Sequence, residues 1–399
     1  MNAAALARVG YRRVSGSEVC ELHRCPWRWH LHHVRRLTRR EGESKPGTVW
    51  GTAYHAAIAL LLLRRASATT STGLDFGDAF VAALVALAER GIEPDDVLAW
   101  RKTTRIARDV CEEAARAAEE VDAWLHAAGW RVAVLPMGEG GAMVPAVERH
   151  LAATWTVDGV TFGGDGRCDA LMWDPQGRLC LVDHKTVDRW PEKSGAALMG
   201  DEVGGGIDLR DDFQARNYLE ILGTMGIKVE RVLHLIRRAA VPKPPPLAYA
   251  VTDKRHGPSR AKDVETTPDL YRAAVIACGK DPADYTTEIE RAGFVRWQAW
   301  ATVDVHPAAR RRTLPIVRDA VERMDTYAPR DSEDVPRHPV AGKHPGSCAR
   351  CPDRELCVLE GRGEDSRLDA TIEVEGRYVT TTDRYPADTH VDLGDPNDD

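Results

Sequence analysis

Four short segments rich in β-favouring residues constrain the fold of this chain more than any other feature of its sequence. Asp158-Gly159 separates two of them and Asp174-Pro175-Gln176-Gly177 separates the next two, which predicts antiparallel hairpins. A tight second hairpin places Asp169 opposite residue 182 or 183. The four segments cover residues 130–135, 145–157, 160–173 and 179–186.

The last of these segments carries the residues with the clearest chemistry. Asp183 and Lys185 are two residues apart, so their side chains share one face of the strand while His184 points to the other. The hairpin brings Asp169 to the same patch. Two carboxylates and an ammonium suit phosphodiester hydrolysis with Mg²⁺ or Mn²⁺, because hard oxygens bind the metal and a lysine stabilises negative charge on the phosphate. A surface ion pair is the alternative interpretation.

Helical periodicity predicts that most of the first 128 residues are α-helical. Ser15-Gly16-Ser17-Glu18 has the form of a capping box, and the helix that it starts should run to about Leu37. The glycine-rich segment 200–206 lacks the Gly-Lys-Ser/Thr ending of a phosphate-binding loop, and the proline-rich segment 241–246 indicates a rigid connection. Further helices are expected over 49–65, 78–90, 95–128, 211–225 and 307–327, and a strand over 229–237.

Four short motifs follow one another along the chain: Gly51-x-x-x-His55, Gly166-x-x-Asp169, Asp183-x-Lys185 and Gln214-x-x-x-Tyr218. The ordered set resembles the RecB-like exonuclease branch of the PD-(D/E)xK superfamily. This branch includes RecB- and AddB-type nuclease domains, CRISPR-associated RecB-like exonucleases and phage relatives. The resemblance covers about residues 14–359. Many members of the superfamily have glutamate where this chain has Asp183, although aspartate is common in the branch.

The resemblance implies a role for each matching residue. His55, Asp169 and Asp183 would bind Mg²⁺ or Mn²⁺ together with the peptide carbonyl of His184, and Lys185 would be the catalytic lysine beside Asp169 and Asp183. Gln214 and Tyr218 would lie beside the site and contact the DNA strand. Glu148, on the preceding segment, is a weaker candidate for a second metal or a supporting role.

The cysteines near the C-terminus indicate a metal site, because nine cysteines in a chain without an export signal make a disulfide framework a weak interpretation. Cys348, Cys351 and Cys357 form a C-x2-C-x5-C pattern. The resemblance implies that Cys25, which precedes Pro26, joins them to bind a 4Fe–4S cluster. Zinc is the alternative, with His344 as a candidate fourth ligand, and Cys20 is the alternative to Cys25. Cys111, Cys168, Cys180 and Cys278 are expected to be small core residues.

Charge and hydropathy indicate what the protein contacts and where it is found. The net charge is −7, but arginines and histidines crowd residues 23–45, and we expect that segment to contact phosphates unless it is only a solvated helix face. No apolar run approaches the roughly 18 residues that span a bilayer, and residues 1–13 lack the apolar stretch of a secretory signal. We therefore expect a soluble cytoplasmic protein that does not bind membranes.

We expect an α/β fold with a restriction-endonuclease-like core, in which helices flank a mixed sheet, and an N-terminal helical region. One nuclease domain over residues 1–360 would comprise a helical region (14–128), a catalytic core (129–327) and a cysteine-rich segment (328–360), followed by a disordered acidic tail (361–399). The expected activity is metal-dependent hydrolysis of DNA, exonucleolytic on single strands, in recombination, repair or phage DNA metabolism. A helicase or recombination protein is a candidate partner. The alternative is a catalytically silent DNA-binding or scaffold protein of the same fold.

Overall fold

The computed structural model divides into two compact units. The larger unit comprises Met1–Gly10, Lys45–Ala153 and Gly164–Thr313, and the smaller unit comprises Tyr11–Ser44, Thr154–Gly163 and Leu314–Asp399. We call them the large unit and the small unit. The structure describes residues 12–34, 37–39, 46–67, 76–100, 103–137, 141–187, 199–200, 206–207, 212–239, 244–249, 256–260, 266–292, 295–304, 307–327 and 378–380.

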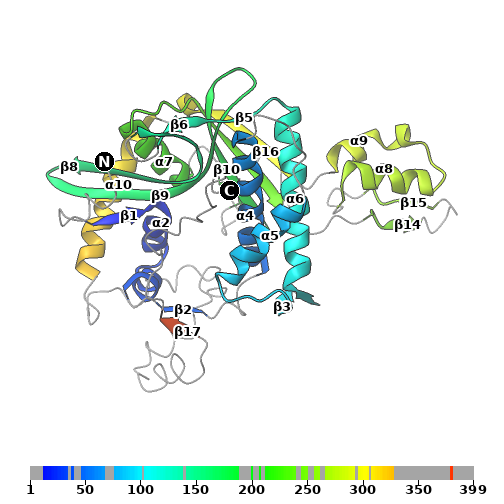
Figure 1. Ribbon diagram of the computed structural model, residues 1–399, viewed down its shortest axis with the longest axis horizontal. Helices are drawn as coiled ribbons and strands as arrows, with labels where there is room; N and C mark the ends of the chain where they lie inside the picture. Colours follow the sequence, from blue (N-terminus) through cyan, green and yellow to red (C-terminus); the bar gives the residue numbers. More distant parts are fainter. Residues whose placement is uncertain are drawn as a thin grey trace, which may run out of the picture. The chain divides into compact units, whose positions relative to one another are not determined.

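A mixed sheet forms the centre of the large unit (Figure 1). Its order is β9 (Val160–Trp173), β10 (Leu179–Val187), β13 (Arg231–Arg238) and β16 (Val295–Ala301). β10 and β13 are parallel and are connected through α7 (Phe213–Thr224), whereas the other neighbours are antiparallel. β5 (Arg131–Val132) and β8 (Val147–Val157) also pair with β9. The first residues of β9 belong to the small unit, and there β1 (Arg13–Ser15) pairs with the strand, with the Gly163 nitrogen donating to the Arg12 carbonyl. The expected mixed sheet flanked by helices is confirmed.

Both predicted hairpin turns are present. Asp158 and Gly159 have positive φ angles of 50° and 81°, which suit the two central positions of a hairpin turn. In the second turn the Asp174 carboxylate accepts hydrogen bonds from the backbone nitrogens of Gln176 and Arg178. Val182 pairs with Ala170, so residue 183, and not residue 182, lies opposite residue 169.

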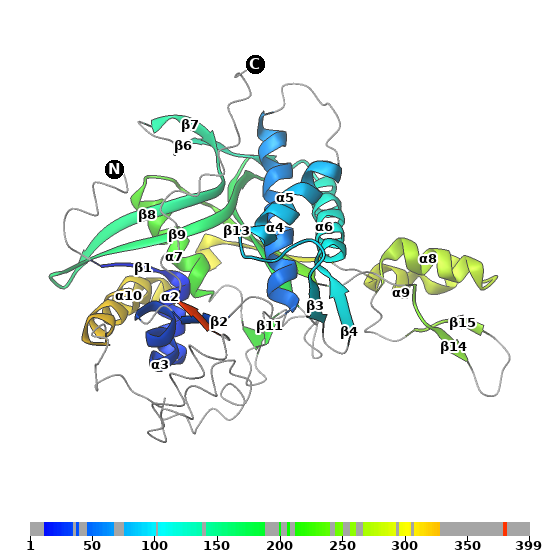
Figure 2. The ribbon, with the colours of Figure 1, turned by 60° about the horizontal axis from the view of Figure 1, so that its bottom comes forward.

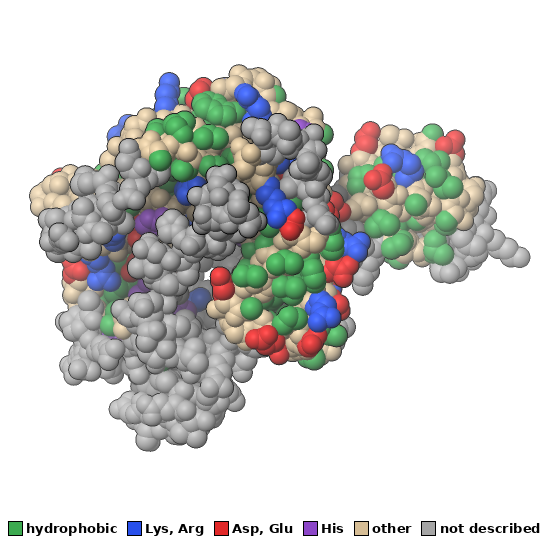
Figure 3. All heavy atoms as spheres, in the orientation of Figure 1, with side chains coloured by type: hydrophobic (Ala, Val, Ile, Leu, Met, Phe, Trp, Pro, Cys, Tyr) green, Lys and Arg blue, Asp and Glu red, His purple; other side chains and the backbone are tan. Residues whose placement is uncertain are grey.

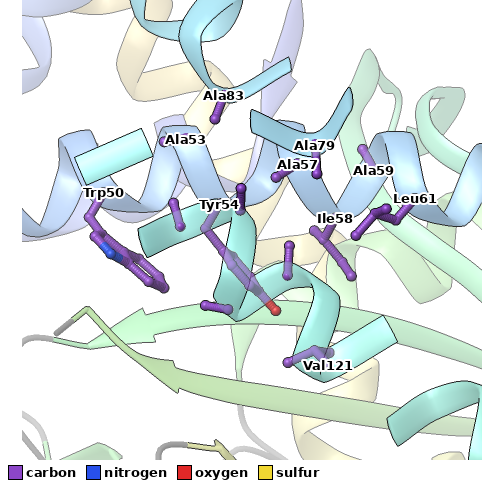
Figure 4. Close-up of a cluster of buried hydrophobic side chains, with 14 of the residues drawn as sticks. Trp50, Ala53, Tyr54, Ala57, Ile58, Ala59, Leu61, Ala79, Ala83 and Val121 are labelled. Carbon is purple, nitrogen blue, oxygen red and sulfur yellow. The ribbon is translucent and has the colours of Figure 1, made fainter. Parts of the chain in front are cut away.

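Three helices cover one face of this sheet: α4 (Pro46–Ser67), α5 (Phe76–Ala88) and α6 (Ala107–Ala127). α4 contributes inward-facing residues at helical spacing, including Trp50, Tyr54 and Ile58 (Figure 4). The strands contribute Val182 and Leu233 to the same core, so Asp183 and its pairing partner His234 lie on the opposite face. The space-filling view shows hydrophobic side chains over the outer face of α5 (Figure 3), where Val81 and Val85 are exposed.

Two predicted helices have different bounds in the structure. The helix expected over residues 95–128 begins only at Ala107, because residues before it form the hairpin of β3 (Val97–Trp100) and β4 (Thr103–Ile106). The first helix keeps its predicted cap, with Ser15 Oγ accepting from the Glu18 nitrogen at 3.2 Å, but α2 (Gly16–Arg24) ends before Cys25. Pro26 cannot continue the helix because it has no backbone N–H. The chain restarts as α3 (Pro26–Trp29) and the π-helix η1 (His30–Val34).

The small unit joins the N-terminal segment to later parts of the chain. The His30 Nδ1 donates a hydrogen bond to the carbonyl of Tyr327 at 3.0 Å, at the end of α10 (Pro307–Tyr327), a helix with the predicted bounds. β2 (Leu37–Arg39) pairs with β17 (Tyr378–Thr380), so these three residues of the expected disordered tail form a strand.

A subdomain of the large unit was not predicted (Figure 2). It consists of β14 (Leu247–Tyr249), β15 (His256–Pro258), α8 (Pro268–Ala277), η5 (Pro282–Tyr285) and α9 (Thr286–Arg291), with a small core of its own around Tyr271, Val275, Tyr285 and Ile289. The remaining elements are β6 (Val134–Pro136), β7 (Met143–Pro145), β11 (Met199–Gly200), β12 (Gly206–Ile207) and η6 (Thr302–Asp304).

The glycine-rich segment 200–206 and the segment 241–246 lie mostly outside the described residues. Among the helices that the structure describes, none is both long enough and apolar enough to cross a membrane.

Candidate active site

One cluster of metal-binding residue types combines His55 of α4, Glu148 of β8 and Asp169 of β9. The His55 Nδ1 lies 3.6 Å from Asp169 Oδ1 and 4.0 Å from Glu148 Oε1. All three side chains are partly buried, and one ligand atom from each lies within 4.8 Å of the others. We call these residues the histidine–carboxylate cluster. Two of them, His55 and Asp169, were predicted metal ligands, and Glu148 was the weaker candidate.

The backbone around this cluster is unusual at two positions, Gly51 and Glu148. A Cβ on Gly51, one helical turn before His55, would lie 2.8 Å from Thr186 Oγ1, so glycine lets α4 approach the end of β10. Glu148 has a positive φ of 50°, a conformation that costs free energy in a non-glycine residue. Arg167 holds it there, because its Nε lies 3.2 Å from the Glu148 carbonyl oxygen and 2.9 Å from Oε2.

The positive charge near the two carboxyl groups of this cluster is too small to offset the effect of their burial. Burial raises the pKa of Glu148 to about 8, the charge of Asp169 adds to this effect, and Arg167 only partly opposes it. Burial also raises the pKa of Asp169, although His55 and the backbone N–H of His184 oppose it. The latter donates to Asp169 Oδ2 at 2.6 Å. A cation bound here would remove the penalty that burial imposes on both carboxylates.

A second group surrounds Lys185 on the neighbouring strand. Its Nζ lies 3.1 Å from Asp183 Oδ2 and 3.5 Å from Asp212 Oδ2. The His234 Nδ1 donates to the same Asp183 oxygen at 2.7 Å. Burial alone would raise the pKa of Asp183, but the charge of Lys185 and the hydrogen bond from His234 outweigh it and hold that pKa well below its ordinary value. The two carboxylates in turn raise the pKa of Lys185 despite its burial. We call these four residues the lysine cluster.

A chain of hydrogen bonds links Lys185 to the strand that carries Asp169. The Lys185 ammonium donates to Gln214 Oε1 at 3.0 Å, and Gln214 Nε2 donates to the Tyr218 hydroxyl at 3.0 Å. That hydroxyl donates to the Arg167 carbonyl at 2.7 Å. A Cβ on Gly166 would lie 2.5 Å from Tyr218 Cε1, so glycine makes room for the ring. Each of the three linked side chains therefore donates a hydrogen bond to the next group.

His184 points away from the lysine cluster, as strand alternation predicts. Its ring is buried against α4, where Nδ1 shares a hydrogen bond with the Tyr54 hydroxyl at 3.2 Å. Burial and the charge of His55 lower the pKa of His184 to about 3, so the ring is neutral near pH 7. The ring therefore has a packing role here, and only the backbone of His184 faces the carboxylates, through its N–H.

Two observations bear on the predicted site, whose residue roles stay predictions. Asp183 lies in the lysine cluster and not in one compact set with His55 and Asp169. Gln214 and Tyr218, predicted to contact DNA, belong to an internal hydrogen-bond chain, and Tyr218 is only 6% exposed. The ring of Tyr218 is therefore not available for stacking on a base in this structure.

Sequence reasoning missed Asp212 and His234. Asp212 caps α7, because its Oδ1 accepts from the Gln214 nitrogen at 2.9 Å, and a capping residue directly before a helical pattern was a usable signal. No local pattern identifies His234, which reaches Asp183 through the parallel pairing of β10 and β13.

The predicted iron–sulfur ligands are only partly described. Cys25 is half-buried at the start of α3, where its Sγ accepts from the Arg28 nitrogen at 3.4 Å. Cys348, Cys351, Cys357 and the alternative ligand His344 lie outside the described residues. Cys111, Cys168 and Cys180 are buried as expected, and burial raises the pKa of each thiol to about 12. Cys278, at the end of α8, is only half-buried, so the expectation of a core residue was wrong there.

Comparison with known proteins bears on this arrangement. The family model of the PD-(D/E)XK nuclease superfamily matches residues 13–358. The chain belongs to this superfamily. None of the curated proteins matches the chain. A solved structure described as "Crystal structure of SSO0001" is 14% identical to it, and the match covers 36% of this chain and 49% of that chain with a TM-score of 0.15. The match thus spans about half the length of that chain.

PD-(D/E)XK nucleases use divalent metal ions, and the residues present fit such an ion. The histidine–carboxylate cluster offers carboxylate oxygens, which Mg²⁺ and Mn²⁺ prefer, and one imidazole nitrogen. The raised pKa values of Glu148 and Asp169 indicate that the cluster favours added positive charge. The lysine cluster already contains its cation.

Proposed function

We propose that this PD-(D/E)XK superfamily member is a DNA nuclease in which His55, Glu148 and Asp169 bind Mg²⁺ or Mn²⁺ and Asp183 and the His184 carbonyl complete the metal site. The observation that carries the proposal is the link between the two clusters. Asp169 accepts the backbone N–H of His184, the residue between Asp183 and Lys185, so the metal-binding and lysine groups are fixed to one another.

The residues divide the chemistry of hydrolysis between them. A divalent cation would polarise the phosphate and acidify a water molecule. Lys185 would stabilise the negative charge that grows on the phosphate oxygens while water attacks phosphorus and the bond to the leaving oxygen breaks. The proton of the attacking water passes to solvent, and the leaving oxygen takes a proton from solvent. Asp183, ionised because of Lys185 and His234, is ready to accept a cation without first losing a proton.

We further propose that the enzyme is a RecB-like exonuclease acting on single strands, with a helicase or recombination protein as partner. The support is the ordered motif set from Gly51 to Tyr218, whose two helical motifs are characteristic of that branch. Both motif glycines also have a steric reason here, against Thr186 and Tyr218.

The test compares linear single strands labelled at the 5′ or 3′ end with a closed single-stranded circle of the same sequence. Linear strands should shorten progressively from one end in Mg²⁺ or Mn²⁺, and EDTA should stop the reaction. The closed circle should persist. Rapid opening of the circle, at enzyme levels that degrade linear DNA, would refute the exonuclease assignment and leave the nuclease assignment intact.

A 4Fe–4S cluster held by Cys25, Cys348, Cys351 and Cys357 is part of the same proposal. Two contacts of the small unit support it, because they hold both flanks of the cysteine segment near the segment that carries Cys25. The chain leaves Tyr327, which accepts a hydrogen bond from His30, before it reaches Cys348. After Cys357 it returns to pair β17 with β2. Thiolates bind iron–sulfur clusters and zinc alike, so metal analysis decides between the two.

A further inference from the structure

Three oxygen atoms lie within hydrogen-bond or ion-pair distance of the Lys185 ammonium. Asp183 Oδ2 lies at 3.1 Å, Gln214 Oε1 at 3.0 Å and Asp212 Oδ2 at 3.5 Å. Only two of these acceptors, the carboxylates, carry charge. In the proposed reaction Asp183 also serves the metal, and its Oδ2 already accepts a hydrogen bond from His234. Asp183 therefore cannot be the sole counter-ion that keeps Lys185 in place.

The same three residues, Asp183, Asp212 and His234, are close enough to one another to hold a metal ion. The position of Lys185 argues against that role. Its ammonium lies within ion-pair distance of both carboxylates, so a divalent cation would have to displace a charge of the same sign from a mostly buried space. The cation that this group binds is the lysine itself.

We propose that Asp212 is a positioning residue for Lys185, holding its ammonium in the reactive position while Asp183 binds the metal. The inference rests on the proposed function, because it needs Asp183 at the metal and Lys185 at the phosphate. It assigns a catalytic consequence to a residue outside the four sequence motifs.

The local structure fixes Asp212 well enough for this task. Its Oδ1 caps α7 by accepting from the Gln214 nitrogen at 2.9 Å, which leaves Oδ2 directed to Lys185. The side chain is 15% exposed, so solvent screens its charge only in part. The start of α7 thus supplies both Asp212 and Gln214, two of the three acceptors of the ammonium.

The closing experiment uses the full-length protein and the variant Asp212→Asn. Asparagine keeps the oxygen that caps α7 and removes the charge, so folding should be unaffected. We expect kcat on linear single-stranded DNA to fall about 10- to 100-fold, the loss typical of a misplaced catalytic group. KM for DNA and the Kd for Mn²⁺, measured by calorimetry on the same protein, should stay within about 2-fold of wild type. Asp212→Glu, which restores the charge, should recover part of kcat.

The matched control is Asp281→Asn in the unpredicted subdomain. Asp281 makes the same type of cap, with Oδ1 accepting from the Ala283 nitrogen at 2.9 Å, and its variant should cleave like wild type. An unchanged kcat in Asp212→Asn would overturn the inference, and so would a matching loss of Mn²⁺ affinity, which would make Asp212 a metal ligand. A wild-type protein that cleaves no DNA in Mg²⁺ or Mn²⁺ would overturn the proposed function and the inference with it.

Discussion

Different interactions stabilise the interior of the large unit and the interior of the small unit. In the large unit, alanine-rich faces of α4, α5 and α6 pack on the sheet in an apolar core, and the reactive groups form the histidine–carboxylate cluster and the lysine cluster. In the small unit, a polar network runs between buried aromatic side chains. Glu21 accepts hydrogen bonds from His32 and His33, and Glu18 accepts one from the Trp29 indole at 3.1 Å.

This contrast separates chemistry from stability. Removing a reactive group from the large unit leaves its apolar core intact, so cleavage should change far more than the free energy of unfolding. The small unit depends on paired charges and, in our proposal, on a cluster, so changes there should lower stability while the chemistry of the intact protein persists. Each of the following four predictions tests that separation.

The largest expected effect is that of Lys185→Ala. We expect kcat for DNA cleavage to fall at least about 1,000-fold, because the charge that grows on the phosphate loses its stabilising cation. The affinity for DNA should stay near wild type and circular dichroism should show a folded protein, although loss of the ion pair with Asp183 lowers the midpoint of thermal unfolding. Lys228→Ala, at an exposed position after α7, is the control. Cleavage near the wild-type rate by purified Lys185→Ala would show that the assigned mechanism is wrong.

The next effect concerns the small unit. Protein purified without oxygen should be brown, and Cys25→Ser should remove the colour and lower the free energy of unfolding by about 3 kcal/mol, as loss of a long-loop cross-link does. Cys278→Ser is the control and should change neither. A colourless wild-type protein with one zinc per chain would replace the iron–sulfur cluster with zinc and keep the cross-link.

Metal affinity tests the large unit directly. His55→Ala and Glu148→Gln should each weaken Mn²⁺ binding about 10- to 100-fold, because each removes one ligand from a cluster whose carboxylates favour a cation. Calorimetric titration gives the Kd, and the melting temperature without metal should not fall. His150→Ala, on the same strand as Glu148 but with an exposed side chain, should bind Mn²⁺ like wild type. Equal affinities for all three variants and wild type would remove this cluster from the site.

The smallest expected effect is the pH dependence of the small unit. Burial would raise the pKa of Glu21, but hydrogen bonds from His32 and His33 and the charge of Arg28 outweigh it and hold that pKa well below its ordinary value. A lowered folded-state pKa contributes stability above the unfolded value of about 4.5, and this contribution is lost as pH falls below it. Wild type should therefore lose about 2 kcal/mol more than Glu21→Gln between pH 6 and 3. Urea unfolding at several pH values measures the difference, and parallel curves for the two proteins would contradict it.

Local patterns in the sequence predicted much of the central sheet. The turns at Asp158 and Asp174 set the hairpins, and strand alternation placed Asp183 and Lys185 on one face with His184 on the other. The bounds of α10 and the cap at Ser15 were also predictable. These features depend on residues close together in the chain, and their geometry follows from backbone sterics and nearest hydrogen bonds.

Other features were missed for two reasons. The helix end before Pro26 and the hairpin before Ala107 had local signals, a proline without an N–H and β-favouring residues such as Thr103, which helical periodicity concealed. The subdomain around Tyr271 and Tyr285 buries its own small core, which short and irregular elements did not reveal.

The sequence by itself determined which chemical groups are present and which strand face each one occupies: Asp183 beside Lys185, and His184 turned away. Only the tertiary structure decided how these groups are divided between the histidine–carboxylate cluster and the lysine cluster. The packing of α4 on the sheet set His55 beside Glu148 and Asp169, and the crossover through α7 brought Asp212 to Lys185 and His234 to Asp183. The reason is physical: a strand fixes the direction of its side chains through its own backbone, whereas the position of an ammonium among carboxylates depends on elements that only packing brings together.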